Sequence, residues 1–245
     1  MKAIILSAGR GSRLLPLTEN MPKCLLPVRD TTLLGCQLDT LEAAGIRHAT
    51  VVTGFMPGLV EAELASRNGP LKATPFFNPF FQVADNLASC WMVREQMDEE
   101  FLLINGDTLF EISLLQDVLS SPVRPIQVTI DRKASYDSDD MKVTLEGTRL
   151  IAIGKSLAQA DSHAESIGIL RFMGEGPGMF RAKIEQMLRT QDGISAWFLK
   201  AIDAIARTTG EVETLSIQGR AWAEVDTVAD FEALGSLPFL ARPYL

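Results

Sequence analysis

The chain has 245 residues, of which 47% are hydrophobic and 22% charged, and its formal net charge is -8 at pH 7. This composition is that of a globular protein, and the negative charge argues against broad binding to nucleic acid or to an anionic membrane. Three cysteines, Cys24, Cys36 and Cys90, form no CxxC pair and no metal-ligand cluster, so we expect buried thiols in a reducing compartment. No stretch approaches the roughly 20 apolar residues of a membrane span. We therefore expect a cytoplasmic protein that binds neither nucleic acid nor membrane.

Short apolar runs alternate with helical patterns through the first half of the chain. Runs of this kind predict strands buried on both faces at Lys2–Ser7, Ala49–Thr53, Phe101–Asn105 and Ile126–Ile130. Apolar residues at helical spacing predict helices at Thr32–Ala44, Gly58–Ser66, Asn86–Met97 and Ile112–Leu119. Strands that alternate with helices indicate a mostly parallel sheet with helices on both faces.

The second half of the chain has a different rhythm. Two strand patterns, Met141–Leu145 and Leu150–Gly154, flank a predicted hairpin turn. Further strands are predicted at Ser166–Phe172, Val212–Ile217 and Ala221–Val225, and helices at Gly178–Thr190, Ala196–Thr208 and Val228–Leu234. Because no repeat, low-complexity tract or linker interrupts the chain, we predict one domain over residues 1–245.

The first predicted strand runs into a loop that contains two glycines and two arginines, Leu6-Ser7-Ala8-Gly9-Arg10-Gly11-Ser12-Arg13. Small residues directly after a buried strand let successive backbone N–H groups approach a phosphate. The glycines do not complete a dinucleotide-binding G-x-G-x-x-G, since position 14 is leucine, and no Gly-Lys-Ser/Thr of a Walker A loop is present. Arg13, and Lys23 after Pro22, supply cations that can meet a bound triphosphate.

The segment AIILSAGRGSRLLPLTENMPKCLLPV resembles the signature of the NTP-transferase family, which makes nucleotide sugars and nucleotide-activated alcohols. The family pattern L-x-x-G-x-G-x-R-x-x-P-L-T, followed by P-K-x-L-x-P, is matched at nearly every fixed position. The resemblance implies a single-domain, Rossmann-like three-layer α/β/α fold of the nucleotide-diphospho-sugar transferase type, with a mixed, mostly parallel central sheet. Residues 1–130 would mainly bind nucleotide and residues 131–245 mainly the acceptor. Catalysis would depend on Lys23 and Arg13, and the nucleotide-binding positions would include Leu6, Ala8, Gly9, Gly11, Ser12 and Gly106.

Acidic residues follow two later strands. Asp107 closes Leu103-Ile104-Asn105-Gly106-Asp107, at the strand end where open α/β sheets bind ligands. An isolated acid there is otherwise a turn residue or a helix cap. Glu224 and Asp226 alternate along a predicted strand and should share one face, although Asp226 could instead cap the helix that follows. The resemblance implies that Asp107 and Asp226 bind Mg2+ with Glu224 close by, and oxygen ligands suit this ion.

The segment Asn78-Pro79-Phe80-Phe81-Gln82-Val83-Ala84-Asp85-Asn86-Leu87-Ala88-Ser89 narrows the resemblance. It is similar to the N-P-F/Y…A-D/N-N-L-x-S segment of bacterial choline-phosphate cytidylyltransferases and related phosphonate cytidylyltransferases. Sugar-nucleotide synthases usually carry G-L/T-A-x-A at this place. The likeness implies CTP as the nucleotide, with Asn86 and Ser89 near the base and ribose. The segment is also an amphipathic helix with an Asn or Asp cap, and the two interpretations are compatible.

The same resemblance implies residues that bind the acceptor. Lys155 stands where the family lysine grips the acceptor phosphate, and Lys142 with Asp131 fits the pattern D-x-x-x…K-V of this branch. Glu165 begins an E-S-x-G-I element that lines the acceptor pocket, and Trp222 is expected to face the same pocket. A lysine after a strand is otherwise a solvated side chain, and Glu165 could equally be the start of an edge strand.

The head group of the acceptor is left open by the sequence. A trimethylammonium group needs an aromatic cage, for which several aromatic residues are candidates. A primary amine would instead depend on an acid, and Asp161 or Glu165 could serve.

The sequence therefore predicts a Mg2+-dependent cytidylyltransferase that joins the CMP of CTP to a phosphocholine- or 2-aminoethylphosphonate-type acceptor and releases pyrophosphate. No general base is required, because a phosphate monoester is largely dianionic at pH 7. His48 and His163 accordingly belong to no catalytic pattern. The alternatives are a sugar-1-phosphate or inositol-phosphate nucleotidyltransferase, and a nucleotide-binding regulatory homologue without catalysis. The oligomeric state is not determined, and a homodimer stays open.

Overall fold

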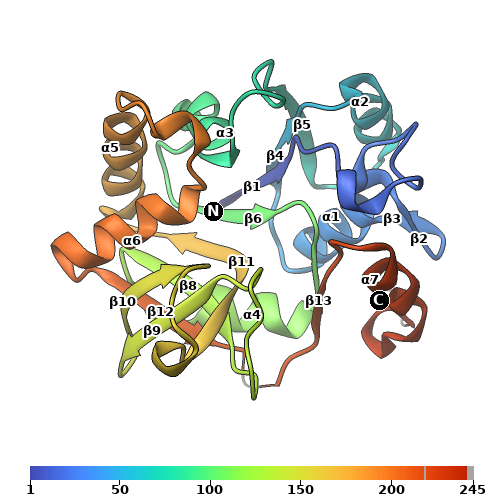
Figure 1. The fold of residues 1–245 in the computed structure, drawn as a ribbon. Helices are drawn as coiled ribbons and strands as arrows, with labels where there is room; N and C mark the ends of the chain where they lie inside the picture. Colours follow the sequence, from blue (N-terminus) through green and yellow to red (C-terminus); the bar gives the residue numbers. More distant parts are fainter. Residues whose placement is uncertain (218, 242–245) are drawn as a thin grey trace. The chain divides into compact units, whose positions relative to one another are not determined.

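A computed structural model describes residues 1–217 and 219–241 of the chain, which is mixed α/β with a central sheet (Figure 1). The chain divides into two compact units, and each draws on several segments of the sequence. The first unit comprises Met1–Phe81, Ile104–Leu119 and the stretch from Arg220 onward, and the second comprises Gln82–Leu103 and Ser120–Gly219. The prediction of one domain over residues 1–245, with residues 1–130 mainly for nucleotide and 131–245 mainly for the acceptor, stays a prediction.

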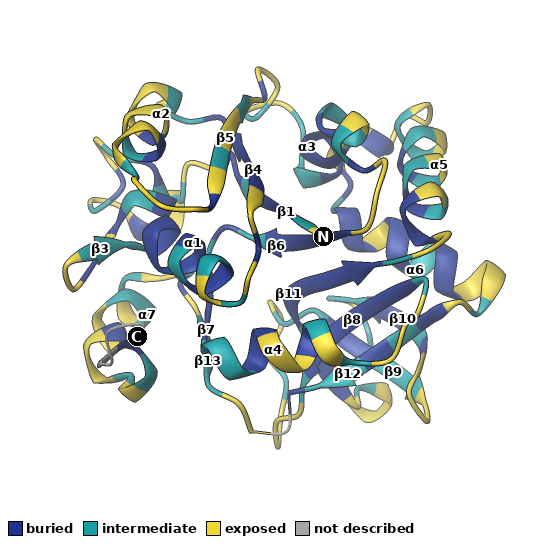
Figure 2. Ribbon diagram, turned by 180° about the vertical axis from the view of Figure 1, so that it is seen from behind, coloured by how far each residue is buried: buried dark blue, intermediate teal, exposed yellow. Residues whose placement is uncertain are grey.

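Parallel strands form the sheet of the first unit, in the order β5 (Lys72–Phe77), β4 (His48–Thr53) and β1 (Lys2–Ser7). Strands β1 and β4 are the continuous apolar runs expected from the sequence, and most of their residues are buried (Figure 2). Helices α1 (Leu33–Ala43) and α2 (Pro57–Ser66) follow β1 and β4 in the chain and belong to the same unit.

Strand β5 is missing from the sequence prediction. Pro75 interrupts its apolar run, and four of its six residues are exposed. A proline is tolerated on an edge strand because its missing N–H then costs no ladder hydrogen bond. The edge position therefore explains both the proline and the weak hydrophobic signal.

A short antiparallel pairing joins two distant segments of the first unit. Strand β7 (Thr108–Phe110), a second strand absent from the prediction, pairs with β13 (Trp222–Glu224), and Thr108 lies opposite Glu224. Another small pair joins β2 (Pro27–Val28) to β3 (Thr31–Thr32). The β7–β13 pairing brings the turn before β7 next to the chain that leaves β13.

Strand β13 is shorter than the predicted strand Ala221–Val225, and Asp226 lies beyond its end. The expectation that Glu224 and Asp226 share one face of a strand is therefore wrong. The chain turns here because a capping box starts helix α7 (Val228–Ala233): the Thr227 hydroxyl accepts the N–H of Asp230, and the Asp230 carboxylate accepts the N–H of Thr227. Thr227 is the helix cap, which leaves the Asp226 side chain for another role.

A hydrophobic cluster in the first unit anchors the segments that carry its charged residues. Its buried members are Leu14, Leu26, Val28, Leu33, Cys36, Leu109, Val225, Leu234 and Leu240. Leu14 directly follows Arg13, Val225 separates Glu224 from Asp226, and Leu109 comes two residues after Asp107. Packing of these apolar neighbours thus fixes the backbone from which each charged side chain projects.

The second unit contains a mixed sheet. Its strands are β8 (Ile126–Asp131), β9 (Lys142–Glu146), β10 (Arg149–Gly154), β11 (Ala164–Phe172) and β12 (Val212–Ser216). The β8–β12 pair is parallel, whereas β8–β11, β9–β10, β9–β11 and β10–β12 are antiparallel. Strands β9 and β10 form the predicted hairpin, with Gly147 at a φ of 65° in its turn.

The helices of the second unit are α3 (Asn86–Met92), α5 (Gly176–Leu188) and α6 (Phe198–Thr209). Strand β6 (Phe101–Asn105) and helix α4 (Ile112–Ser120) each cross the boundary between the units. Helix α3 is shorter than the predicted Asn86–Met97, because a 3-10 turn at Arg94–Gln96 replaces its last part. Within the described residues, no helix is both long and apolar enough to traverse a bilayer.

Candidate active site

The Lys23 ammonium lies between two carboxylates in the first unit. Its Nζ donates to Oδ2 of Asp107 at 2.7 Å and to Oδ1 of Asp226 at 2.7 Å. These acids are 84 and 203 positions away from Lys23 in the chain. Arg13 adds a second cation, with Nη1 at 3.8 Å from Oδ2 of Asp226. The structure thus brings together four charged residues that sequence analysis selected from three separate segments.

Backbone hydrogen bonds hold the turn that carries Asp107. The N–H of Gly106 donates to the Leu6 carbonyl at 3.0 Å, and the N–H of Val225 donates to the Asp107 carbonyl at 3.1 Å. A Cβ on Gly106 would lie only 2.5 Å from the Leu6 oxygen, so a glycine is required at this close approach. The first strand, the Asp107 turn and the chain after β13 are therefore tied directly to one another.

Gln37 is a positioning residue that the sequence analysis missed. It is almost fully buried in α1, and its Nε2 donates to the carbonyls of Asn105 at 2.7 Å and Thr108 at 2.8 Å. These two carbonyls flank Gly106 and Asp107, so one amide group spans the turn. The only signal in the sequence was a polar residue on the apolar face of a predicted helix.

The glycine-containing loop is shaped around Lys23. Gly11 has a left-handed backbone with φ 71°, and the Thr18 hydroxyl donates to its carbonyl at 2.7 Å. A Cβ on Gly11 would approach the Cβ of Lys23 to 2.8 Å, too close for two carbon atoms. Of the other loop positions selected from the sequence, Ala8 is buried and Leu6 half-buried, while Gly9 and Ser12 are exposed.

Replacing Gly11 by alanine should therefore disturb both the loop and Lys23. A left-handed backbone costs an L-residue about 1–2 kcal/mol, and the added methyl group must push the Lys23 stem away. We expect a lower melting temperature for Gly11→Ala in thermal unfolding. Gly9→Ala is the matched control, because a Cβ there meets nothing within 4 Å and its φ is not positive. Equal melting temperatures for the two variants would contradict this account of the loop.

The two carboxylates keep Lys23 charged. Burial alone would lower the pKa of Lys23, but the attraction and hydrogen bonds of Asp107 and Asp226 outweigh it, so the pKa is raised above its ordinary value. Lys23 is therefore an ammonium at neutral pH and carries a fixed positive charge at the site.

The carboxylates of Asp107, Glu224 and Asp226 fit a divalent cation. One oxygen from each lies within 4.8 Å of the others. Oδ1 of Asp107 is buried and has no hydrogen-bond partner, although a buried oxygen of this kind normally has one. Hard oxygen donors from separate segments are the ligand type that Mg2+ takes. Asp107, Asp226 and Glu224 are thus the residues that would hold the ion.

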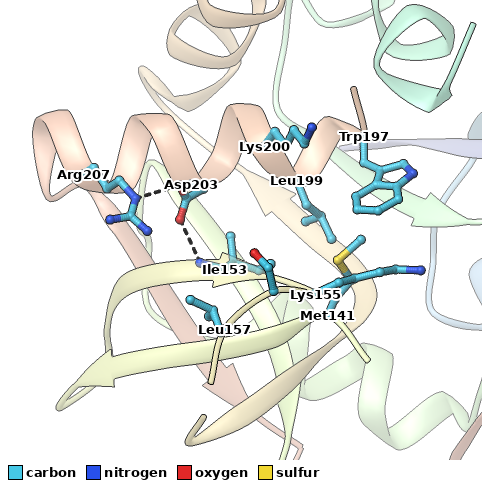
Figure 3. A pocket seen from close by; sticks show the side chains of 11 residues that line it. Met141, Ile153, Lys155, Leu157, Trp197, Leu199, Lys200, Asp203 and Arg207 are labelled. Atoms are coloured by element: carbon cyan, nitrogen blue, oxygen red, sulfur yellow. Dashed lines mark hydrogen bonds and ion pairs between the residues drawn. The ribbon is translucent and has the colours of Figure 1, made fainter. Parts of the chain in front are cut away.

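The second unit contains a cavity of about 580 Å³ beside Lys155 (Figure 3). Its polar lining includes Lys200, Asp203 and Arg207 from α6, and apolar side chains such as Leu157 and Leu199 complete it. Lys155 Nζ lies 3.2 Å from Oδ1 of Asp139 and 4.8 Å from the centre of the Trp197 ring. The cavity thus combines cations with one aromatic face, a lining suited to an anion with a small organic substituent.

Two other acceptor residues selected from the sequence, Lys142 and Glu165, are buried near one another in the second unit, whereas Trp222 is half-buried on β13 of the first unit. Glu165 of β11 lies opposite Lys142 of β9, and each is about 95% buried or more. Lys142 Nζ donates to the Asp137 carbonyl at 2.7 Å, and Lys133 Nζ lies 2.6 Å from Oε1 of Glu165. Burial raises the pKa of Glu165 to about 7, with the Lys133 ammonium partly opposing this and Asp140 adding to it.

Asn86 and Ser89 both lie in α3, and the Asn86 side chain makes a hydrogen bond that links two helices. Its Oδ1 accepts the N–H of Phe198 at 2.8 Å, which ties the start of α3 to the start of α6. The helix cap is Asp85, whose carboxylate accepts the N–H of Asn86. Ser89 is buried at 5% exposure. Their roles beside the base and ribose stay predictions.

Comparison with models of protein families shows which family the chain belongs to. The model for nucleotidyl transferases matches residues 2–130, more than half of the chain, so the protein belongs to the nucleotidyl transferase family. The matched segment includes the loop around Gly11, Lys23 and Asp107.

Two solved structures share the fold. The CTP:phosphocholine cytidylyltransferase from Streptococcus pneumoniae is 21% identical with a TM-score of 0.80, over 96% of this chain and 97% of its own. The inositol-1-phosphate CTP transferase from T. maritima is 20% identical with a TM-score of 0.81, over 98% and 94%. This likeness confirms the predicted Rossmann-like α/β fold.

Curated relatives match almost the whole of this chain. A CTP:phosphoglutamine cytidylyltransferase of Campylobacter jejuni is 22% identical, over 95% of this chain and 98% of its own length. The CMP-5'-(3-aminopropyl)phosphonate synthase of Streptomyces rubellomurinus is 26% identical over 94% of this chain, which spans only 37% of that longer protein.

Proposed function

We propose that the protein is a Mg2+-dependent cytidylyltransferase. It transfers the CMP group of CTP to a small phosphorylated amino-alcohol or the corresponding phosphonate and releases pyrophosphate. Relatives whose names give CTP as the donor, with phosphoglutamine or choline phosphate as the acceptor, support the nucleotide and the general class of acceptor. The observation that carries the proposal is the Lys23 ammonium, 2.7 Å from both Asp107 and Asp226.

The reaction is an in-line substitution at the α-phosphorus of the nucleotide. An acceptor oxygen forms the new P–O bond, and the bond between the α-phosphorus and the bridging oxygen breaks, so its electron pair leaves with pyrophosphate. A phosphate monoester has a second pKa near 6 and reacts as a dianion at pH 7. No protein group need remove a proton, which agrees with the absence of histidine among Lys23, Arg13 and the acids.

The difficulty of this reaction is the approach of two anions. Bound Mg2+, held by Asp107, Asp226 and Glu224, would supply Lewis-acid neutralisation of the reacting oxygens. Lys23 neutralises charge at the transferred phosphorus, and Arg13, with its side chain half-exposed, orients the pyrophosphate that leaves. The backbone from Ala8 to Ser12, opened by Gly9 and Gly11, receives the phosphates. Catalysis then rests on positioning and electrostatics.

The acceptor phosphate is proposed to bind Lys155 in the cavity of the second unit. Lys200 supports this assignment, because it is a second lysine among the lining residues of the cavity and its Nζ lies 5.8 Å from the Trp197 ring centre. Two positive charges there favour an anion even though the whole chain carries a net charge of -8. Lys142 and Glu165 are proposed to line the acceptor pocket. There they either hold the surrounding strands in place or contact the acceptor head group.

The aromatic contacts favour a primary amine over a trimethylammonium in the acceptor. Two of the three tryptophans already face a cation of the chain: Trp197 faces Lys155 and Lys200, and Trp91 faces Arg94 at 4.0 Å. A lysine or arginine held against a ring must give up that contact before another cation can take the same face. The role of Trp222, half-buried in β13 of the first unit, as an acceptor contact stays a prediction. Glu165 is proposed as the acid for a primary ammonium, which would take the place of Lys133 at its carboxylate.

Pyrophosphate release over a matrix of substrates tests the proposal. Each of the four NTPs is combined with 2-aminoethylphosphonate, phosphocholine, inositol phosphate or glucose-1-phosphate. We expect turnover with CTP and the aminophosphonate above all other combinations. Higher turnover of glucose-1-phosphate with UTP or dTTP would instead establish the sugar-nucleotide alternative. Nucleotide binding with no turnover of any acceptor would leave a regulatory homologue.

A further inference from the structure

We propose that Lys23 and the divalent cation exclude one another, so that the metal enters the site together with the triphosphate and not before it. The inference rests on the proposed metal site of Asp107, Asp226 and Glu224. It goes further because it assigns Lys23 a second task, control of when the metal binds.

The ammonium and the metal would compete for the same two carboxylates. Lys23 Nζ lies 2.7 Å from Oδ2 of Asp107 and 2.7 Å from Oδ1 of Asp226, which places it between the two carboxylates. A Mg2+ ion binds its oxygens at about 2.0–2.1 Å. A cation that bridges Oδ2 of Asp107 and Oδ1 of Asp226 would therefore take up the space of the ammonium. The singly charged ammonium and the doubly charged metal ion would also repel each other strongly at such a short distance.

The charges of the site show why an ammonium belongs there. Three carboxylates contribute oxygens within 4.8 Å of one another, and like charges at such distances repel. Lys23 is well placed to offset this repulsion, because only 14% of its side chain is exposed. Arg13 lies farther from the acids and is 54% exposed, so solvent screens more of its charge. Lys23 therefore neutralises the negative charge of the acids, as a bound metal cation would.

The triphosphate gives Lys23 another anion to bind. The Lys23 stem runs along Gly11, in the loop whose backbone is proposed to receive the phosphates. When nucleotide arrives, the ammonium can exchange its carboxylates for phosphate oxygens, which frees Asp107 and Asp226 for the metal. Binding of nucleotide and metal is then coupled, and coupling of this kind acts equally in both directions.

The alternative is a metal that uses the unpartnered Oδ1 of Asp107 while Lys23 keeps its place on Oδ2. In that arrangement, removal of the Lys23 ammonium would change metal affinity only through its charge. Removal of the Arg13 charge would then also raise metal affinity, by less only to the extent that solvent screens it. The position of the Lys23 ammonium when the metal is bound therefore distinguishes the two accounts.

The test is a titration of Mn2+ into the full chain without nucleotide, with bound Mn2+ measured by electron paramagnetic resonance. Lys23→Met should bind Mn2+ more tightly than the wild type, by roughly 5- to 150-fold, the range of typical coupling between sites. Arg13→Met, which removes an equal charge beside Asp226, should give a distinctly smaller gain. Equal affinity of Lys23→Met and wild type would overturn the inference, as would equal gains for both variants.

A third variant separates this inference from the proposed metal site. Asp107→Asn should lose Mn2+ binding in the wild-type and the Lys23→Met backgrounds. Undiminished binding in Asp107→Asn would show that the metal ligands themselves are wrongly assigned. Should Lys23→Met not fold, Lys23→Gln is titrated instead. Wild-type crystals soaked in Mn2+ together with CTP should also show the Lys23 ammonium displaced from the carboxylates, and a metal on both acids with the ammonium still between them would contradict the exchange.

Discussion

Asp107→Asn and Asp226→Asn should each lower kcat/KM by roughly 10³-fold with CTP and the best acceptor. A metal ion contributes several kcal/mol of transition-state stabilisation, and about 1.4 kcal/mol corresponds to a factor of ten. Asparagine retains the size of the side chain but loses the negative charge that both Lys23 and a divalent cation require. The measurement is steady-state pyrophosphate release as a function of Mg2+ concentration, with the fold of each variant checked by circular dichroism.

Asp117→Asn is the matched control for these variants. Asp117 lies in α4 of the same unit and pairs with Arg220 at 2.7 Å, and both side chains are more than 40% exposed. Exposed ion pairs of this kind are worth only about 0–1 kcal/mol, so the control should keep its activity. If Asp107→Asn and Asp226→Asn were as active as the control, neither acid would be a metal ligand.

Lys23→Met should lower kcat by about 10²- to 10³-fold, the usual cost of losing one preorganised charge or donor at a transition state. KM for CTP should change much less, because the ammonium is matched to charge that develops at the transferred phosphorus. Initial rates over a matrix of CTP and acceptor concentrations separate the two constants. Lys72→Met is the control, since Lys72 is exposed on β5 of the same unit.

A change confined to KM would assign Lys23 to ground-state binding of the nucleotide and remove its catalytic role. A fall in both kcat and the melting temperature would instead point to general damage of the site. The stability of the variant is therefore measured alongside its kinetics. The Mn2+ titration then shows whether the loss of activity coincides with tighter metal binding.

Much of the fold follows from patterns that the sequence displays directly. Strands β1 and β6 have the predicted bounds, and β4 and β8 differ from them by one residue, because long apolar runs between turn residues allow few other structures. Strand β5 escaped prediction for the opposite reason, since an exposed edge strand with a proline has no such run. Strand β7 was not predicted because its three residues are too few to form a recognisable strand pattern.

The charged residues of the candidate site were found by family resemblance, but their arrangement was not predictable from spacing. Asp226 was expected on a strand beside Glu224, whereas it lies in the turn between β13 and the capping box of α7. Gln37 escaped notice because its function depends on the carbonyls of Asn105 and Thr108, about 70 positions away. The position of Lys23 between two acids likewise depends on how distant segments pack, so the sequence did not predict it.

Anomalous diffraction from crystals grown with Mn2+ and CTP tests the central claim most directly. We expect one anomalous peak in coordination contact with both Asp107 and Asp226, and Lys23 Nζ in contact with phosphate oxygens of the same nucleotide. A peak away from these two carboxylates, or a triphosphate bound out of reach of Lys23, would contradict the account.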